Sequence, residues 1–139
     1  IIALEIAARL EARGCRNVQL YLLDSFYRQA TAELPLDQLL PALGIEGEAA
    51  TRAMAAGQAE RRLSEGSLSR RLQTTKVTLF KATERNPQLP EAVTAPLLAV
   101  ADNGLGAVCE RLRVIPLACH HHNILLCEEA IGQALNDDV

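Results

Sequence analysis

Apolar and polar positions along the chain form two kinds of pattern, continuous runs and helical stripes. Runs of apolar and β-branched residues, typical of strands buried in a parallel sheet, occupy residues 18–23, 77–82 and 112–118. Helical spacing marks residues 1–14, which close on a glycine suited to a C-cap, and residues 124–135. Strands that alternate with helices predict an α/β fold with a mostly parallel sheet, right-handed crossovers and helices on both faces.

The segments between the strand runs have weaker patterns. Residues 30–72 carry prolines and glycines between helical stretches and no convincing strand, which predicts a helical insertion. Short helical pieces are expected at residues 36–43, 48–63 and 67–72. Residues 92–101 are apolar but interrupted by Pro96, and they fit either a packed extended segment or a short helix.

Composition narrows the class of protein. The chain has 139 residues, which suits one domain or a piece of a larger one, and 49% of them are hydrophobic. The net charge of −3 argues against a nucleic-acid-binding surface, which needs clustered basic residues. No apolar run approaches the roughly 20 residues of a membrane span, and charged residues interrupt the first helix where a signal peptide would be apolar. We therefore expect a cytoplasmic protein with no nucleic-acid or membrane partner.

The first helix has no residue suited to an N-cap before it, which predicts that the helix continues from a segment encoded upstream. Three strands are also too few to cover the helical faces that the pattern predicts. We therefore expect further strands of the same sheet outside this sequence.

Two places carry candidate chemistry. Asp24 ends the first predicted strand, where it fits either the functional edge of an α/β sheet or a cap of the turn through Ser25. His120, His121 and His122 lie on the loop between the last strand and the last helix, where α/β proteins often place reactive side chains. A solvated polar turn, a chance cluster and a tag remnant are the alternatives for the histidine run.

The four cysteines have no C-x-x-C spacing and look like reduced thiols. A zinc site built from Cys119, His120, His122 and Cys127 is conceivable, since these are common zinc ligands. The spacing fits no zinc-finger pattern, so we expect no metal.

Five segments in order resemble the thioesterase domains of nonribosomal peptide and polyketide synthases, which are α/β-hydrolases. Residues 1–14, IIALEIAARLEARG, resemble the helix that follows the nucleophile elbow in this family. LYLL followed by DSFY at residues 20–27 resembles the strand that ends in the catalytic Asp, and residues 30–72 take the place of the lid. VTLFKA at 77–82 resembles the next strand, and HHNIL at 121–125 fits the histidine loop, H-x-x-[MI]-L.

The resemblance implies roles for two residues. His121 would be the general base, because the apolar pair Ile124 and Leu125 begins three residues after it, and Asp24 would accept its other imidazole N–H. His120 and Cys119 depart from the residues usual at these positions, which bears on the geometry of the loop. The order Asp then His also agrees with the order of triad members in α/β-hydrolases.

The family's G-x-S-x-G-G elbow is not in this sequence, and it would lie immediately before Ile1. Ser64, Ser67 and Ser69 fall in the predicted lid, and Ser25 directly follows Asp24. The resemblance therefore implies that residues 1–139 are the carboxyl-terminal part of a thioesterase domain, which needs an amino-terminal half and is inactive in acyl transfer alone.

The complete domain would release a peptidyl or acyl chain from the phosphopantetheine thioester of a carrier protein. Release would pass through an acyl-Ser intermediate and end in hydrolysis or macrocyclisation, with the lid shaping the pocket and no cofactor bound directly. A stand-alone editing thioesterase is one alternative. A non-catalytic module that contacts a carrier protein is another, and its basic residues would be Arg61, Arg62, Arg70 and Arg71.

Overall fold

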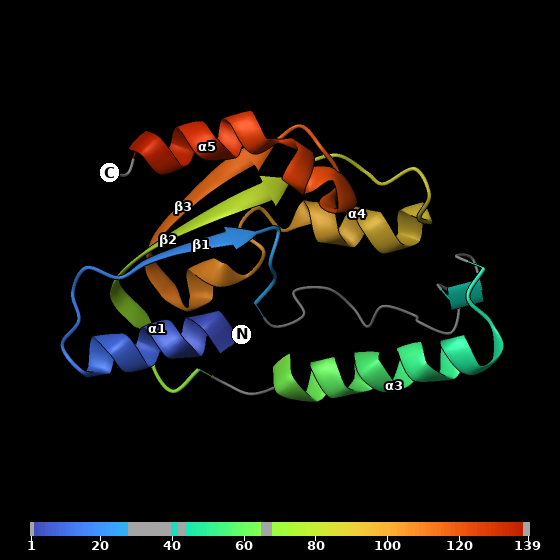
Figure 1. Cartoon of the computed structure of the whole chain (residues 1–139), viewed down its shortest axis with the longest axis horizontal. Helices are drawn as coiled ribbons and strands as arrows, with labels where there is room; N and C mark the ends of the chain where they lie inside the picture. The colour runs from blue at the N-terminus through green and yellow to red at the C-terminus, as the bar shows by residue number, and fades with distance from the viewer. Residues whose placement is uncertain (1, 28–39, 42–43, 65–67, 138–139) are drawn as a thin grey trace.

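The computed structural model describes residues 2–27, 40–41, 44–64 and 68–137. Its centre is a sheet of three parallel strands in the order β1-β2-β3 (Figure 1). The strands are β1 (Gln19–Leu23), β2 (Leu72–Ala82) and β3 (Cys109–Leu117). The helices are α1 (Ile2–Ala12), α3 (Gly47–Ser64), α4 (Glu91–Ala99) and α5 (Glu128–Asp137), with short 3-10 helices η1 (Leu105–Ala107) and η2 (His121–Leu126). The predicted α/β architecture with parallel strands is confirmed.

The central strand β2 divides the core into two apolar clusters. Val77 and Leu79 pack on one face with buried residues of α1, β3 and η1. Phe80 and Ala82 pack on the other face with Leu117, η2 and α5. Because side chains alternate along a strand, these two sets lie on opposite faces of the sheet. The prediction of helices on both faces is therefore confirmed.

Helix α1 packs on the sheet through one leucine and two alanines. Leu4, Ala7 and Ala8 are buried against β2, whereas Ile2 and Ile6 are 67% and 55% exposed. The helix ends as predicted, at a glycine in the left-handed conformation, with φ of +86° at Gly14.

Two sequence expectations need correction. Strand β1 is half-buried along most of its length, not buried on both faces, because it lies at the edge of the described sheet. The helix expected at residues 67–72 is wrong for its described part. Residues 68–71 are not helical, and Leu72 already begins β2, so the insertion ends before residue 72.

The remaining segments follow the sequence patterns more closely. Helix α3 accounts for the long helical piece expected at residues 48–63, whereas most of the piece at 36–43 lies outside the described residues. Most of the ambiguous segment at residues 92–101 is helical, because α4 continues to Ala99 with Pro96 inside it. Within the described parts of the chain, no helix combines the length and the apolar character that crossing a bilayer requires.

Candidate functional site

Asp24 directly follows β1, at the carboxyl end of the sheet. Its backbone N–H donates to the carbonyl of Phe80 at 2.8 Å, so the ladder continues one residue beyond the strand. Its φ is +39°, a conformation that Asp tolerates better than most residues. The Ser25 hydroxyl donates back to the Leu23 carbonyl at 3.2 Å. The Asp24 side chain instead points inward, and the residue is 6% exposed.

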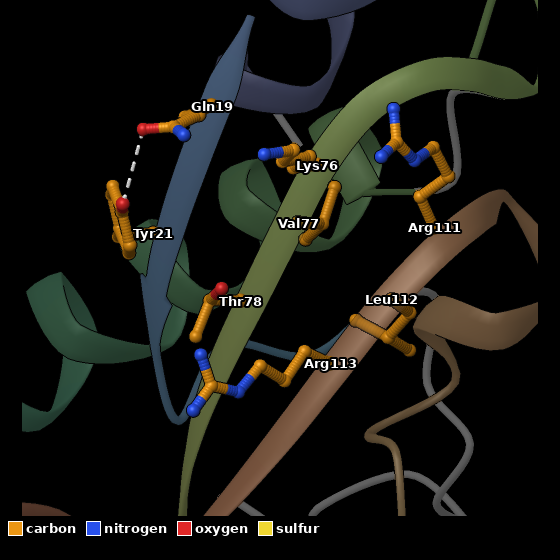
Figure 2. A pocket seen from close by; sticks show the side chains of 8 residues that line it. All are labelled: Gln19, Tyr21, Lys76, Val77, Thr78, Arg111, Leu112 and Arg113. Carbon is orange, nitrogen blue, oxygen red and sulfur yellow. Dashed lines mark hydrogen bonds between the residues drawn. The ribbon is translucent and has the colours of Figure 1, made fainter. Parts of the chain in front are cut away.

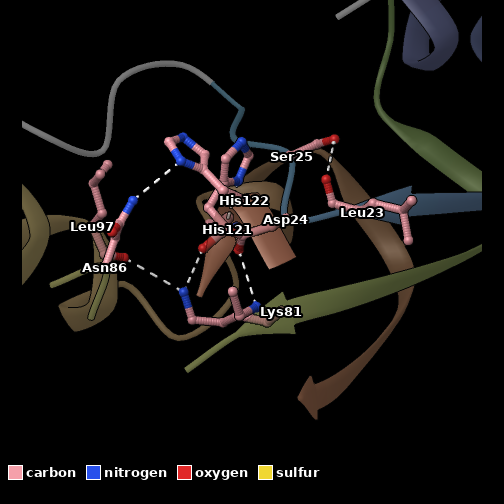
Figure 3. Close-up of polar contacts among 10 residues, drawn as sticks. Leu23, Asp24, Ser25, Lys81, Asn86, Leu97, His121 and His122 are labelled. Carbon is pink, nitrogen blue, oxygen red and sulfur yellow. Dashed lines mark hydrogen bonds and ion pairs between the residues drawn. The ribbon is translucent and has the colours of Figure 1, made fainter. Parts of the chain in front are cut away.

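The Asp24 carboxylate has a different partner for each oxygen. Oδ1 accepts the backbone N–H of Ala82 at 3.2 Å and the Nδ2–H of Asn103 at 3.1 Å. Oδ2 lies 3.0 Å from Nδ1 of His121 (Figure 3). These contacts favour the functional edge over the turn cap, because every described partner of the carboxylate lies outside the turn that follows it.

His121 is the first residue of η2, which begins four residues after β3. Residues i and i+3 of a 3-10 helix lie one above the other, so His121 shares a side of the helix with Ile124. Ile124 is buried against Phe80 and Leu117, whereas Leu125 is 70% exposed. Burial of Ile124 therefore holds His121 towards the carboxyl end of the sheet, where Asp24 lies.

The pairing with Asp24 changes the acid–base properties of His121. The hydrogen bond that the imidazole donates to the Asp24 carboxylate, together with the negative charge of that carboxylate, raises the pKa of His121, and partial burial only partly opposes this rise. The side chain of His121 is 62% exposed, whereas that of Asp24 is only 8% exposed. The pair therefore joins a fixed, buried carboxylate to an imidazole that solvent or a substrate can reach.

The other two histidines of the run have different surroundings. His122 Nδ1 lies 3.1 Å from Nδ2 of Asn86, in the loop after β2. His120 precedes η2, and its Nδ1 is buried with no hydrogen-bond partner among the described residues. Of the three, His121 is the one that the structure brings to Asp24 (Figure 3).

Sequence reasoning missed two polar residues behind Asp24. Asn103 is fully buried and donates to Asp24, and its Oδ1 accepts from Nζ of Lys81 at 2.6 Å. Asn103 is the centre of the sequence Asp-Asn-Gly, which on its own indicates only a turn. Lys81 gave a clearer signal, a single charge inside the apolar run Val-Thr-Leu-Phe-Lys-Ala. A charge at such a position is rare unless it is paired, which could have marked the site.

The cysteines do not gather with the histidines into a metal site. In the ranges that the structure describes, no three His, Cys, Asp or Glu side chains converge in a way that could hold a metal ion. Burial, together with the contact with Cys127, raises the pKa of Cys119 to about 11. A thiol in this state is a poor zinc ligand and a poor nucleophile, because both roles need the thiolate.

A hollow on the sheet lies apart from Asp24 and His121. Figure 2 shows its lining, which comes from all three strands in the half of the sheet where they begin. The lining residues are Gln19, Tyr21, Lys76, Val77, Thr78, Arg111, Leu112 and Arg113. The hollow does not serve the Asp24–His121 pair, which lies at the opposite end of the strands.

The pair can hold and move a proton. With Nδ1–H donated to Asp24, the neutral imidazole keeps the Nε2 lone pair free to accept a proton from a nucleophile. Among the described residues, no hydroxyl is within hydrogen-bond distance of Nε2, and the Ser25 hydroxyl donates to a backbone carbonyl. The geometry therefore supplies an acid–base pair, with no nucleophile beside it in the part of the chain that the structure describes.

Comparisons with known proteins do not assign the chain to a family. No protein-family model matches the chain, and no curated protein matches it.

Proposed function

We propose that this chain supplies the acid–base half of a serine thioesterase site of the α/β-hydrolase type. His121 takes the proton from a serine and returns it to the leaving group, and Asp24 holds the imidazole and stabilises the imidazolium. The observation that carries this proposal is the 3.0 Å contact between His121 Nδ1 and a buried Asp24 that follows a parallel strand. Two segments 97 residues apart in sequence meet there, in the order expected for such a site.

The nucleophile in this proposal comes from sequence upstream of Ile1. A G-x-S-x-G-G elbow immediately before α1 would place the serine at the amino end of this helix, where backbone N–H groups also favour a developing oxyanion. The simplest test is to read the sequence encoded by the twenty or so codons before Ile1, which is about the length of one strand and one elbow. A reading frame that carries no serine elbow there contradicts the proposal.

The substrate class in this proposal is a peptidyl or acyl thioester on the phosphopantetheine of a carrier protein. An exposed imidazole beside a buried carboxylate suits acyl transfer, since both acylation and deacylation need one proton moved in each direction. In this proposal the lid is the segment of residues 30–72, which contains helix α3, and it would shape the pocket and exclude water. The carrier protein would be the main partner.

The test is thioester release by a protein that joins this chain to its upstream half. We expect His121→Ala to lower kcat/KM for an acyl thioester by about 10²–10⁴, the usual contribution of a general base. His120→Ala and His122→Ala serve as matched controls from the same run, and we expect each to keep most of the activity. Undiminished release by His121→Ala, or equal losses in all three variants, would contradict the assignment.

A further inference from the structure

A buried lysine lies behind the Asp24 carboxylate. Lys81 is the second-last residue of β2 and is 6% exposed. Its ammonium donates to the Leu97 carbonyl at 3.4 Å (Figure 3) and to Asn103 Oδ1 at 2.6 Å. It also lies 5.8 Å from the centroid of the Phe26 ring. Burial of an ammonium is costly unless each of its donors is used. The position of Lys81 therefore calls for a function that an apolar residue could not provide.

Asn103 connects Lys81 to Asp24. An ammonium can only donate, so the amide oxygen of Asn103 must face Lys81, and its NH₂ group must face Asp24 Oδ1 at 3.1 Å. The positive charge on one side polarises the amide and strengthens the hydrogen bond on the other. Lys81 thereby acts on Asp24 through a third residue with which both are in contact.

The turn around Asn103 leaves its side chain little freedom. Asn103 has φ of +52°, and its backbone carbonyl accepts the N–H of Tyr27 at 2.9 Å. The Asp102 carboxylate accepts the N–H groups of Gly104 at 2.9 Å and Gly106 at 3.0 Å, which fixes both sides of the turn. Asn103 is therefore held between the segment after β1 and the segment before β3. Its amide can serve as a rigid support for the carboxylate.

We propose that Lys81 is a positioning residue that acts through Asn103 to hold Oδ1 of Asp24, and so directs Oδ2 towards Nδ1 of His121. The inference rests on the proposed function, because only a general base needs this imidazole in its Nδ1–H form. Lys81 touches no substrate in this arrangement. Its effect is on which ring nitrogen of His121 carries the proton.

The experiment measures the tautomer of neutral His121 in the chain itself. Imidazole ¹⁵N chemical shifts, read through couplings to the carbon-bound ring protons, report the Nδ1–H and Nε2–H fractions without an observable N–H signal. In the wild-type chain we expect His121 to be mainly Nδ1–H at a pH above its pKa. In Lys81→Met, which keeps the length of the side chain and removes the ammonium, we expect His121 to shift towards the Nε2–H tautomer.

Lys76→Met is the matched control, because Lys76 is the other lysine of the chain, is exposed and lies on the same strand. We expect it to leave the tautomer unchanged. Asn103→Gly is the second variant, since glycine accepts φ of +52° and removes both side-chain hydrogen bonds. The double variant Lys81→Met/Asn103→Gly should shift the tautomer no further than Asn103→Gly alone, because both residues act through one chain of contacts.

A wild-type tautomer in folded Lys81→Met overturns the proposal, as does a shift of equal size in Lys76→Met. If Lys81→Met does not fold, Asn103→Gly decides, and a wild-type tautomer in that variant overturns the proposal. The measurement needs no nucleophile and no thioester. If the variants keep the wild-type tautomer, the role of Lys81 is wrong but the proposed acyl transfer can still hold. If the tautomer shifts as expected and no acyl transfer is observed, only the proposed function is refuted.

Discussion

Two carboxylates accept hydrogen bonds from backbone N–H groups of β2, one near each end of the strand. They differ in how many of their oxygens the main chain occupies. Near the start, Glu11 of α1 accepts the N–H groups of Gln73 at 3.0 Å, Thr74 at 2.9 Å and Thr75 at 2.5 Å. At the end, Asp24 accepts the N–H of Ala82 with one oxygen only. Both oxygens of Glu11 are therefore occupied by the main chain, whereas one oxygen of Asp24 is left for His121.

The irregular start of β2 explains the role of Glu11. The pairing of β2 with β3 shifts register between Leu72 and Lys76, so the N–H groups between them converge on the helix instead of on the sheet. An N–H group without a partner is costly where it is buried, as at Thr75, and the Glu11 carboxylate satisfies this group and the two before it. Glu11 is thus a structural group, whereas Asp24 has one oxygen that contacts a side chain, His121, and no backbone N–H among the described residues.

The largest expected effect is a difference in activity between variants of these two carboxylates. Under the proposed function, we expect Asp24→Asn, in a protein joined to the proposed upstream half, to lower kcat for thioester release by about 10⁴, because an amide favours the wrong tautomer of His121. Glu11→Gln should keep kcat, since its contacts lie at the far end of β2. Comparison of the two variants in one release assay checks the prediction. Equal losses of kcat would mean that both act only through the fold.

The second prediction concerns the contribution of Glu11 to the stability of the fold. Burial disfavours the ionised form of Glu11, but the hydrogen bonds from Thr75 and the two residues before it outweigh burial and lower the pKa to about 2. A lowered pKa stabilises the fold above the ordinary pKa of 4.5 and loses this effect as the pH falls towards 2. We expect Glu11→Gln to reduce the free energy of unfolding by about 1–3 kcal/mol at neutral pH.

Urea titrations at several pH values check this second prediction. The wild-type chain should lose stability between pH 4.5 and pH 2, and Glu11→Gln should lose less over the same range. Glu48→Gln is a suitable control, because Glu48 lies on the exposed α3 and forms only a solvated ion pair with Arg52. A Glu11→Gln variant as stable as Glu48→Gln would contradict the structural role.

The third prediction concerns the pH dependence of the Asp24–His121 pair. The carboxylate raises the pKa of His121 above 6.5, so the pair stabilises the fold fully below pH 6.5 and loses this effect as the pH rises through the raised value. The stability change should be smaller than that of Glu11→Gln, because the His121 side chain is 62% exposed. We expect Asp24→Asn to lower the pKa of His121, as an NMR titration of its ring protons would show. A pKa unchanged by Asp24→Asn would contradict the contact.

The sequence predicted the main features of the fold because they depend on local patterns. Continuous apolar runs identified the three strands, and parallel strands bring their carboxyl ends to one edge of the sheet. This rule alone places Asp24 and the histidine loop near each other. The residue patterns alone left three histidines as candidates, and the burial of Ile124 on the same side of η2 shows why His121 is the one that faces Asp24.

Other features could not be predicted, because their partners are distant in sequence. Glu11 looks like one of several surface charges on α1, and its contact with Gln73 spans 62 residues. Asn103 has the signature of a turn, and its contact with Asp24 spans 79 residues. Strand β1 has the composition of a buried strand, yet its exposure is set by which neighbours it has. Such properties belong to the tertiary arrangement and not to any local pattern.

The smallest expected effect comes from substitution of His122, the histidine next to His121. His122 Nδ1 contacts Asn86 Nδ2 at 3.1 Å, and Asn86 Oδ1 also accepts the N–H of Gln88 at 3.0 Å. Asn86 is 4% exposed, so His122→Ala leaves one buried donor without its partner, at a cost of about 1 kcal/mol. Because Asn86 keeps its second contact, the loop after β2 should retain its shape, and kcat should change less than in Asp24→Asn. A urea titration and the release assay measure both quantities, and a kcat loss as large as that of Asp24→Asn would show that the base is not His121 alone.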